Sequence, residues 1–241
     1  MNNFFQFLLE PYQNALTINV ILELIAATLG VVSVFYARSE NIRVYSTGII
    51  STIIYVYLLS QWDMYGDLII NIYYTLMSIY GWYIWSKVIG GKDQQIEISR
   101  ASKKDKFITF GIFLFSSAFV IGVYRYFELI PTHLGVSDSL YHVYENIIAW
   151  DLEKFRTIIP FLDSFTTGAA FAAMWLLANK KIENWIFWIV VNVVSVPLYF
   201  IKGFGFTGVQ YVVFLVLAIF GYLEWERRIK IADIKQSPII D

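Results

Sequence analysis

Seven apolar runs divide this chain, and most are long enough to cross a bilayer as a single helix. They cover Ile18–Tyr36, Tyr45–Leu59, Leu68–Val88, Phe107–Tyr124, Ile158–Leu177, Trp185–Ile201 and Val209–Leu223. About 20 apolar residues in a helix span the hydrocarbon core. The runs lack the alternation of apolar and polar residues that a transmembrane barrel strand needs. Only 15% of the residues are charged, so the sequence predicts an all-α membrane protein that crosses the bilayer several times.

Several classes of chemistry have no support in the sequence. The chain has no cysteine, which excludes disulfides and thiolate catalysis. Its net charge of −1 gives no sign of a nucleic-acid partner. No phosphate-binding loop, metalloprotease motif or nucleophile elbow occurs. We therefore predict no enzymatic activity, no cofactor and no metal site.

Lysine and arginine are distributed unevenly between the loops. The loops after the first, third and fifth runs, together with the C-terminal tail, hold 14 of the 18. The opposite side holds Arg125, Lys154, Arg156 and Lys202. Cytoplasmic loops carry the excess of positive residues. The sequence thus predicts an N-terminus outside the cell and a C-terminus in the cytoplasm.

Three segments lie outside the apolar runs. Residues 1–17 are rich in phenylalanine and leucine, and they predict an interfacial segment. Residues 131–157 predict an amphipathic segment outside the membrane, where we expect a covering helix without chemistry. Its apolar positions have helical spacing: Leu140, Val143, Tyr144, Ile147, Ile148 and Leu152. Residues 229–241 predict a cytoplasmic tail.

The first three runs align with the last three when the chain is shifted by 140 residues. The aligned pairs are Glu23/Asp163, Gly30/Ala170, Gly81/Gly221, Trp85/Trp225 and Lys87/Arg227. We interpret Trp85 and Trp225 as members of the aromatic belt at the membrane interface. The alignment predicts two repeats, residues 18–88 and 158–228, separated by residues 89–130, which hold a cytoplasmic loop and the linking fourth span.

An odd number of spans in each repeat, with one span between them, makes the two repeats point the same way. This 3+1+3 arrangement of two parallel three-helix repeats is that of the SWEET sugar carriers. Parallel repeats of this kind occur in transporters, whose sites lie near the middle of the membrane between the repeats. A receptor without transport is the alternative from a different class, and it would not need such halves.

Polar and aromatic residues form stripes inside three of the runs. The sixth run places Trp185, Trp188, Asn192, Ser195 and Tyr199 on one helical face. The third run offers Asn71, Tyr74, Thr75 and Ser78, and the second offers Tyr55. An amide in hydrocarbon costs several kcal/mol unless it finds a partner. It can hold helices together, worth about 0.6–2 kcal/mol, or face a substrate, and we favour the substrate.

Two acids, Glu23 and Asp163, fall within the outer parts of their spans. Acids inside a membrane mark a functional site or a structural pair. An acidic mouth above tryptophan and tyrosine suits a small organic cation, which aromatic faces attract by about 0.5–2 kcal/mol. Pro197 leaves the backbone carbonyl of Val193 without its helical partner. Either a cavity supplies a partner for this carbonyl, or the proline simply kinks the helix.

These motifs resemble the nicotinamide riboside transporters of the PnuC family. The resemblance rests on "GDLIINIYYTLMSIYGWYIW" (Gly66–Trp85), "WIFWIVVNVVSVPLYFIKG" (Trp185–Gly203) and "FGYLEWERR". It implies a SWEET-like fold of seven spans, a homotrimer and a bacterial inner membrane. It also implies facilitated diffusion, in which a cytoplasmic kinase traps the entering nucleoside.

The resemblance also implies roles for particular residues. The family's tryptophan–tryptophan–asparagine pattern matches Trp185, Trp188 and Asn192, and its asparagine–tyrosine pattern matches Asn71 and Tyr74. Nicotinamide riboside carries a pyridinium ring on which aromatic side chains can stack. Thiamine, another flat cation, and riboflavin are the alternative vitamins.

Overall fold

A computed structural model describes residues 16–61, 65–87, 96–131, 134–149, 151–202 and 205–236. In these ranges the regular structure is helical, apart from one isolated bridge between Ser99 and Lys181. The helices are α2 (Thr17–Arg38), α3 (Arg43–Gln61), α4 (Tyr65–Ser86), α5 (Lys103–Tyr126), α6 (Val136–Ile148), α7 (Leu152–Thr157), α8 (Ile159–Ala178), α9 (Glu183–Ile201) and α10 (Gly205–Gln236).

Six of these helices are long and apolar enough to cross a membrane, which confirms an all-α, multi-pass membrane protein. They are α2, α3, α5, α8, α9 and the Thr207–Ile234 part of α10. Helix α4 corresponds to the predicted third span and has 22 residues. It is not among the six, and it carries the polar stripe of Asn71, Thr75 and Ser78.

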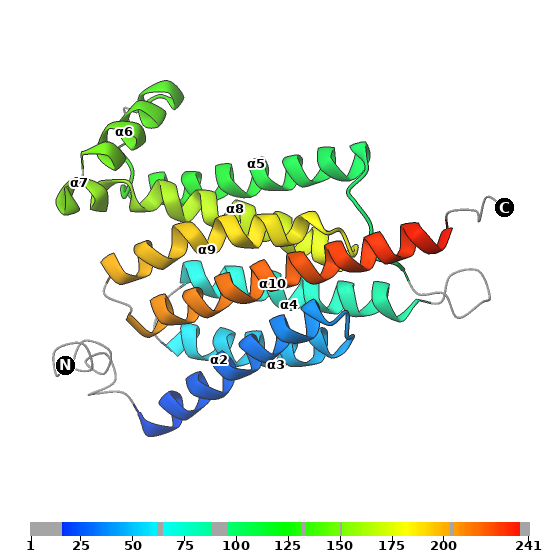
Figure 1. Ribbon diagram of the computed structural model, residues 1–241. Helices are drawn as coiled ribbons and strands as arrows, with labels where there is room; N and C mark the ends of the chain where they lie inside the picture. Colours follow the sequence, from blue (N-terminus) through cyan, green and yellow to red (C-terminus); the bar gives the residue numbers. More distant parts are fainter. Residues whose placement is uncertain are drawn as a thin grey trace.

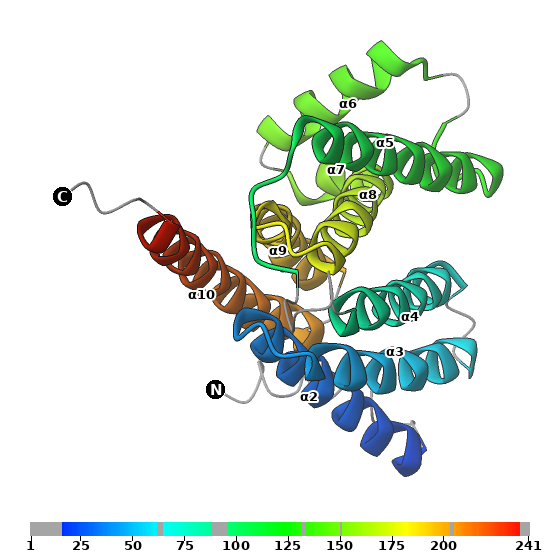
Figure 2. The same ribbon diagram turned by 90° about the vertical axis from the view of Figure 1, so that its right-hand side faces the viewer.

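The long helices form a closed ring (Figures 1 and 2). Around it, α2 packs on α3, α3 on α4, α4 on α8, α8 on α9, α9 on α10, and α10 again on α2. Helix α5 packs against α8 and lies outside this ring. We call α2, α3 and α4 the first half, and α8, α9 and α10 the second half. The halves meet at two junctions, α4 with α8 and α10 with α2.

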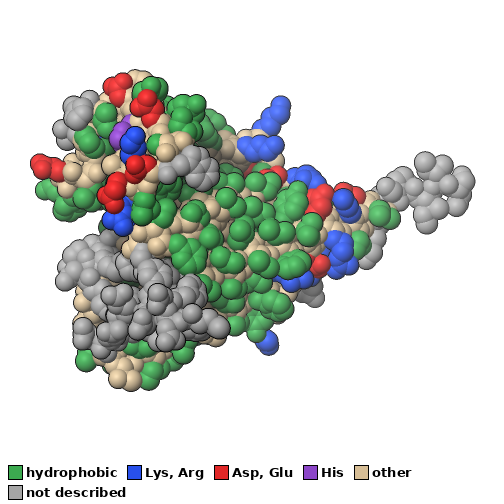
Figure 3. Space-filling view, turned by 60° about the vertical axis from the view of Figure 1, so that its left-hand side comes forward, with side chains coloured by type: hydrophobic (Ala, Val, Ile, Leu, Met, Phe, Trp, Pro, Cys, Tyr) green, Lys and Arg blue, Asp and Glu red, His purple; other side chains and the backbone are tan. Residues whose placement is uncertain are grey.

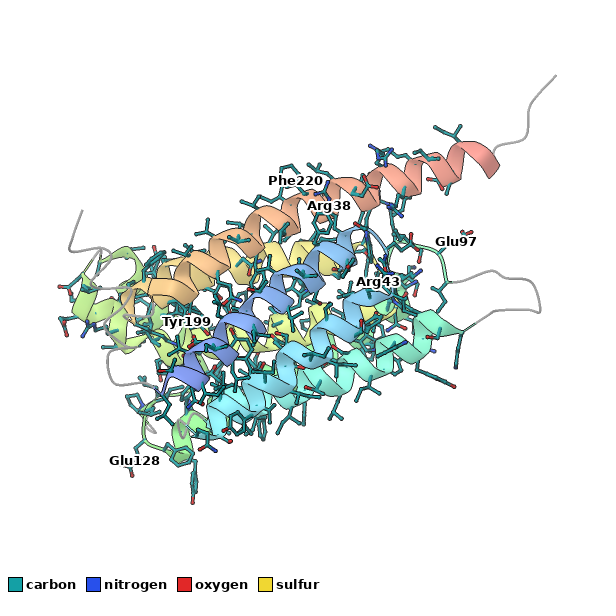
Figure 4. The ribbon with its side chains drawn as sticks, turned by 90° about the horizontal axis from the view of Figure 1, so that it is seen from below. Arg38, Arg43, Glu97, Glu128, Tyr199 and Phe220 are labelled. Carbon is teal, nitrogen blue, oxygen red and sulfur yellow. The ribbon has the colours of Figure 1, made fainter. Side chains whose placement is uncertain are left out.

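The two ends of the bundle differ in charge. Arg38 and Arg43 lie at one end with Glu97, whereas Tyr199 and Glu128 lie toward the other (Figure 4). We call the end with Arg38 and Arg43 the basic end. Between the ends, hydrophobic side chains cover much of the surface (Figure 3). A broad apolar band between polar ends is what a bilayer requires.

The segment between α5 and α8 contains two helices. The predicted amphipathic helix is present as α6, which has no buried residue and stands away from the ring (Figure 1). It ends at Ile148, so the prediction that Leu152 continues its apolar face is wrong. Asp151 starts α7, because its carboxylate accepts hydrogen bonds from the backbone of Glu153 and Lys154.

Helix α10 continues well past the predicted end of the last span. Residues 229–236 were expected in a tail but belong to this helix. Ion pairs one turn apart stabilise the extension, with Arg228 on Glu224 at 2.9 Å and Lys230 on Glu226 at 3.7 Å. Of the predicted interfacial segment 1–17, residues 1–15 lie outside the described residues.

The interpretation of Trp85 and Trp225 as belt residues is wrong. Their exposed fractions are 2% and 0%. The indole of Trp85 donates a hydrogen bond to the backbone oxygen of Ala178 at 3.1 Å, and that of Trp225 donates to the oxygen of Arg38 at 3.2 Å. Both indoles therefore occupy the interior at the basic end, where they satisfy carbonyls that the ends of α8 and α2 leave unpaired.

Candidate functional site

A cavity lies inside the ring and takes its wall from all six ring helices. Helix α5 contributes nothing to it. The wall consists of Gly30, Ser33, Val34, Ala37, Val44, Tyr45, Gly48, Ser51, Thr52, Tyr55, Asn71, Tyr74, Ser78, Met174, Leu177, Trp185, Trp188, Asn192, Gln210, Tyr211, Phe214 and Ala218. A ligand held here contacts both halves at once.

Seven of the ten predicted site residues lie on this wall: Tyr55, Asn71, Tyr74, Ser78, Trp185, Trp188 and Asn192. In α9 the spacing of three and four residues turns Trp185, Trp188 and Asn192 to one face. The opposite face of the helix is apolar and half exposed, as Val193 shows with 53%. Helix α9 thus separates a cavity face from an outward face.

Asn192 is the most informative residue of the wall. Its exposed fraction is 2%, its side chain borders the cavity, and none of the side-chain hydrogen bonds found among the described residues involves it. Asn71 differs, because its amide nitrogen donates to the backbone oxygen of Asp67 at 2.9 Å. An amide that borders a cavity can bond to water or to a ligand there. The Asn192 amide therefore has its donors and acceptor available for a ligand.

Aromatic rings surround this amide. The rings of Tyr74 and Trp188 meet edge to face, with centroids 6.3 Å apart and planes at 65°. Phe171 lies behind Tyr74 at 6.2 Å and fixes its orientation. Aromatic pairs of this geometry are worth about 0.5–1.5 kcal/mol beyond the area they bury. The cavity thus presents firmly held rings against which a flat ligand can stack.

Three predicted site residues do not line the cavity. The hydroxyl of Thr75 hydrogen-bonds to that of Thr52 at 2.7 Å and donates to the backbone oxygen of Asn71 at 2.9 Å. Tyr199 stacks on Tyr211, with centroids 4.8 Å apart. Ser195 is buried. Thr75 and Tyr199 therefore lie behind wall residues and support them.

Several wall residues were not predicted, among them Tyr45, Gln210 and Tyr211. Tyr45 lies 140 residues before Trp185, so the repeat alignment itself held the signal. Gln210 is an amide within an apolar run, like the asparagines that were predicted. Tyr211 had no such signal, because tyrosine is common throughout these helices.

The predicted acids lie outside the cavity wall. The carboxylate of Asp163 pairs with the ammonium of Lys202 at 2.7 Å and accepts a hydrogen bond from the hydroxyl of Tyr124 at 3.1 Å. Asp163 is therefore part of a structural pair, one of the two alternatives left open by the sequence. Glu23 lies near Tyr55.

The wall is uncharged among the residues that the structure describes. It contains no Lys, Arg, Asp, Glu or His. Its polar groups are three amides, from Asn71, Asn192 and Gln210, together with serine, threonine and tyrosine hydroxyls. Such a wall can hydrogen-bond a polar ligand and stack on its ring. The described residues also contain no cluster of three His, Cys, Asp or Glu suited to a metal.

The chain is similar in sequence to several known transporters. It is 22% identical over 208 residues to the nicotinamide riboside transporter PnuC of Escherichia coli, covering 85% of this chain and 84% of that one. It is 26% identical over 215 residues to PnuC of Neisseria mucosa, covering 86% and 72%. The riboflavin/roseoflavin transporter RibM of Streptomyces davaonensis is 24% identical over 150 residues, covering 62% and 58%.

The fold is also that of a solved structure. The crystal structure of the vitamin B3 transporter PnuC superposes with a TM-score of 0.61 at 20% sequence identity, covering 94% of this chain and 90% of that one. A family model described as "Nicotinamide mononucleotide transporter" matches residues 20–227. This match includes every residue that lines the cavity, and the chain belongs to that transporter family.

Proposed function

We propose that this protein carries nicotinamide riboside across the membrane. The observation that supports this most directly is the amide of Asn192, which borders an uncharged cavity together with Trp188. Nicotinamide riboside offers a carboxamide for such an amide and a pyridinium cation for the aromatic rings. Two relatives, from E. coli and N. mucosa, are named for this substrate.

The same wall favours the nucleoside over its 5′-phosphate. The mononucleotide adds a phosphate of about two negative charges at neutral pH. Burying it without a cation would cost far more than an ordinary hydrogen bond returns, and the described wall residues include no Lys or Arg. The pyridinium of the nucleoside, by contrast, gains from the rings of Tyr74 and Trp188.

The membrane arrangement is part of the proposal. Helices α2, α3, α4, α5, α8, α9 and α10 would be seven spans in a 3+1+3 arrangement, with α5 as the link that lies outside the ring. The basic end would face the cytoplasm of a bacterium, across its inner membrane, because positive residues stay inside. The N-terminus would then lie outside and the C-terminus in the cytoplasm.

The remaining features of the proposal come from the family resemblance. Transport would proceed by alternating access and downhill, with a kinase in the cytoplasm trapping the nucleoside after entry. The protein would form a homotrimer. Native mass spectrometry in detergent tests the trimer, and a monomer that transports would contradict it.

Calorimetry and uptake with one set of ligands test the substrate. Purified protein is titrated with nicotinamide riboside, its mononucleotide, thiamine and riboflavin. Each labelled compound is then added outside proteoliposomes that have no energy source, and its uptake is measured. We expect nicotinamide riboside to bind and enter, and the mononucleotide to bind at least about 100-fold more weakly, because its phosphate finds no cation.

Each other outcome has a definite meaning. If thiamine or riboflavin binds more strongly than nicotinamide riboside, that vitamin is the substrate instead. Equal binding of nucleoside and nucleotide would refute the argument from the uncharged wall. Tight binding with no uptake of any of the four compounds would instead indicate a receptor.

A further inference from the structure

Two aromatic residues related by the repeat close the cavity at its basic end. Tyr45 of the first half and Trp185 of the second line the cavity and are each 1% exposed. Behind them, the ring of Tyr45 meets that of Trp85 edge to face at 5.1 Å, and Trp185 meets Trp225 in the same way at 5.6 Å. All four belong to one buried cluster that includes residues of both halves. Residues of both halves together therefore close the cavity at this end.

Two glycines let the rings pack this closely. A β-carbon at Gly81 would stand 2.3 Å from the Tyr45 ring, and one at Gly221 would stand 2.7 Å from the Trp185 ring. Each glycine lies 140 residues from the other, as each ring does from its counterpart. We call the rings of Tyr45, Trp85, Trp185 and Trp225 the seal. Both halves form it in the same way, because in each half the ring of the second helix packs on a glycine of the third helix.

Two hydrogen bonds also join the halves, one donated from each half to the other. Trp85 of the first half donates to the last residue of α8, Ala178, in the second half. Trp225 of the second half donates to the last residue of α2, Arg38, in the first half. Each half thereby holds the other's first helix by its end. Separation of the halves at the basic end has to break both bonds.

An ion pair lies outside this cluster and also joins repeat-related residues. The ammonium of Lys180 meets the carboxylate of Glu40 at 2.7 Å, and its side chain is 1% exposed. Lys180 also lies 4.6 Å over the ring of Trp85. Arg228 adds a second cation to Glu40 at 3.1 Å. Both Glu40 and Lys180 have positive φ, 58° and 50°, so the two turns present these side chains in matching ways.

The closed seal leaves two polar atoms without partners. The hydroxyl of Tyr45 and the indole nitrogen of Trp185 are buried and make no hydrogen bond to any described residue. A buried donor without a partner costs about 1–3 kcal/mol, and contact with water or a ligand restores the bond. The ion pair thus stabilises the closed seal, whereas the two donors favour opening it.

We propose that Tyr45 and Trp185 form the gate between the cavity and the basic end, latched by Glu40 and Lys180. The gate opens when the two halves separate at that end, which exposes both unpaired donors to water and releases the ligand. The inference rests on the proposed transport function for its physiological role. The contacts of the gate themselves do not depend on which vitamin is carried.

Cysteine labelling tests the gate directly, because the natural chain has no cysteine. Ser33 lines the cavity and donates a hydrogen bond to the backbone oxygen of Val44, so Ser33→Cys places a thiol just inside the gate. Vesicles that expose the basic end receive a small, membrane-impermeant thiol reagent. The labelling rate then reports how often the gate opens.

Three further changes are made in the Ser33→Cys protein. Lys180→Met removes the latch, and we expect labelling about tenfold faster. Tyr45→Phe removes an unpaired donor and keeps the ring, so we expect labelling about fivefold slower. Arg100→Gln is the matched control: the Arg100–Glu226 pair lies at the same end at 2.7 Å, but the arginine is 56% exposed, and we expect no change.

Opposite shifts in the two gate variants support the proposal. Labelling of Lys180→Met at the control rate would overturn it, and so would labelling of Tyr45→Phe at the parent rate or faster. If Lys180→Met yields no folded protein, Tyr45→Phe decides alone, since it only deletes a hydroxyl. Labelling needs no substrate, so failure of nicotinamide riboside to bind would refute the proposed function and leave the gate result valid.

Discussion

Replacing Asn192 by leucine should weaken ligand binding without lowering the stability of the ligand-free protein. The amide lines the cavity, and none of the side-chain hydrogen bonds found among the described residues involves it. Leucine has no polar group to leave unpaired. The substitution therefore removes no bond that holds the helices together, and the melting temperature of the ligand-free protein should not fall.

The affinity for the ligand, by contrast, should fall. A ligand carboxamide can form two hydrogen bonds with the Asn192 amide, each worth about 0.5–1.5 kcal/mol. Leucine removes both and leaves the ligand's own groups buried without partners. The loss should total about 2–4 kcal/mol, or roughly 30- to 1,000-fold in Kd.

Differential scanning fluorimetry and calorimetry, with and without nicotinamide riboside, measure both effects. Asn184 provides the control for affinity, because it is a second buried asparagine of the same helix. Its amide nitrogen donates to the backbone oxygen of Lys181 at 2.7 Å, whereas its amide oxygen has no partner among the described residues. Asn184→Leu should leave the affinity for the ligand unchanged, since Asn184 does not line the cavity.

A lower melting temperature in the ligand-free Asn192→Leu protein would refute this reasoning, because it would show that the amide already stabilises the helices. Unchanged affinity would remove Asn192 from the site altogether. A purely structural amide gives both results together, so the two measurements distinguish the alternatives that the sequence left open.

Trp188→Ala should weaken binding by about 1–3 kcal/mol if its ring stacks on the ligand, and calorimetry measures the loss. Gly221→Ala should destabilise the fold by about 1–3 kcal/mol, because its β-carbon would stand 2.7 Å from an indole; Gly111→Ala, with nothing within 4 Å, should not destabilise it in thermal melts. Asp163→Asn should lower the melting temperature, since Lys202 loses its carboxylate partner; an unchanged melting temperature would mean that this pair contributes nothing.

The apolar runs were sufficient to predict the long helices and the cavity face of α9. Polar residues at helical spacing inside an apolar run must face other helices or a cavity, and Trp188 and Asn192 lie on the cavity wall. Boundaries were less predictable where charged residues continue a helix. Helix α10 extends through Glu224 and Arg228, because pairs one turn apart make such a segment helical outside hydrocarbon.

Burial of Trp85 and Trp225 could not be predicted from local sequence. Tryptophan beside a basic residue near a helix end is typical of the membrane interface. What distinguishes these two is a carbonyl at the end of a helix in the opposite half, as in the bond to Ala178. These bonds join residues that are 93 and 187 positions apart in the chain, so the periodicity of the local sequence cannot predict them.

Positions related by the repeat differ according to what they do. The packing positions keep the same residue in both halves, as Gly81/Gly221 and Trp85/Trp225 show. The wall positions diverge: Thr52 corresponds to Asn192, Gly48 to Trp188, and Asn71 to Tyr211. A nucleoside has no twofold symmetry, so a symmetric wall would offer each of its groups two equivalent partners and orient it poorly. Symmetric packing allows the halves to move against each other in the same way, while an asymmetric wall lets them hold one ligand in one orientation.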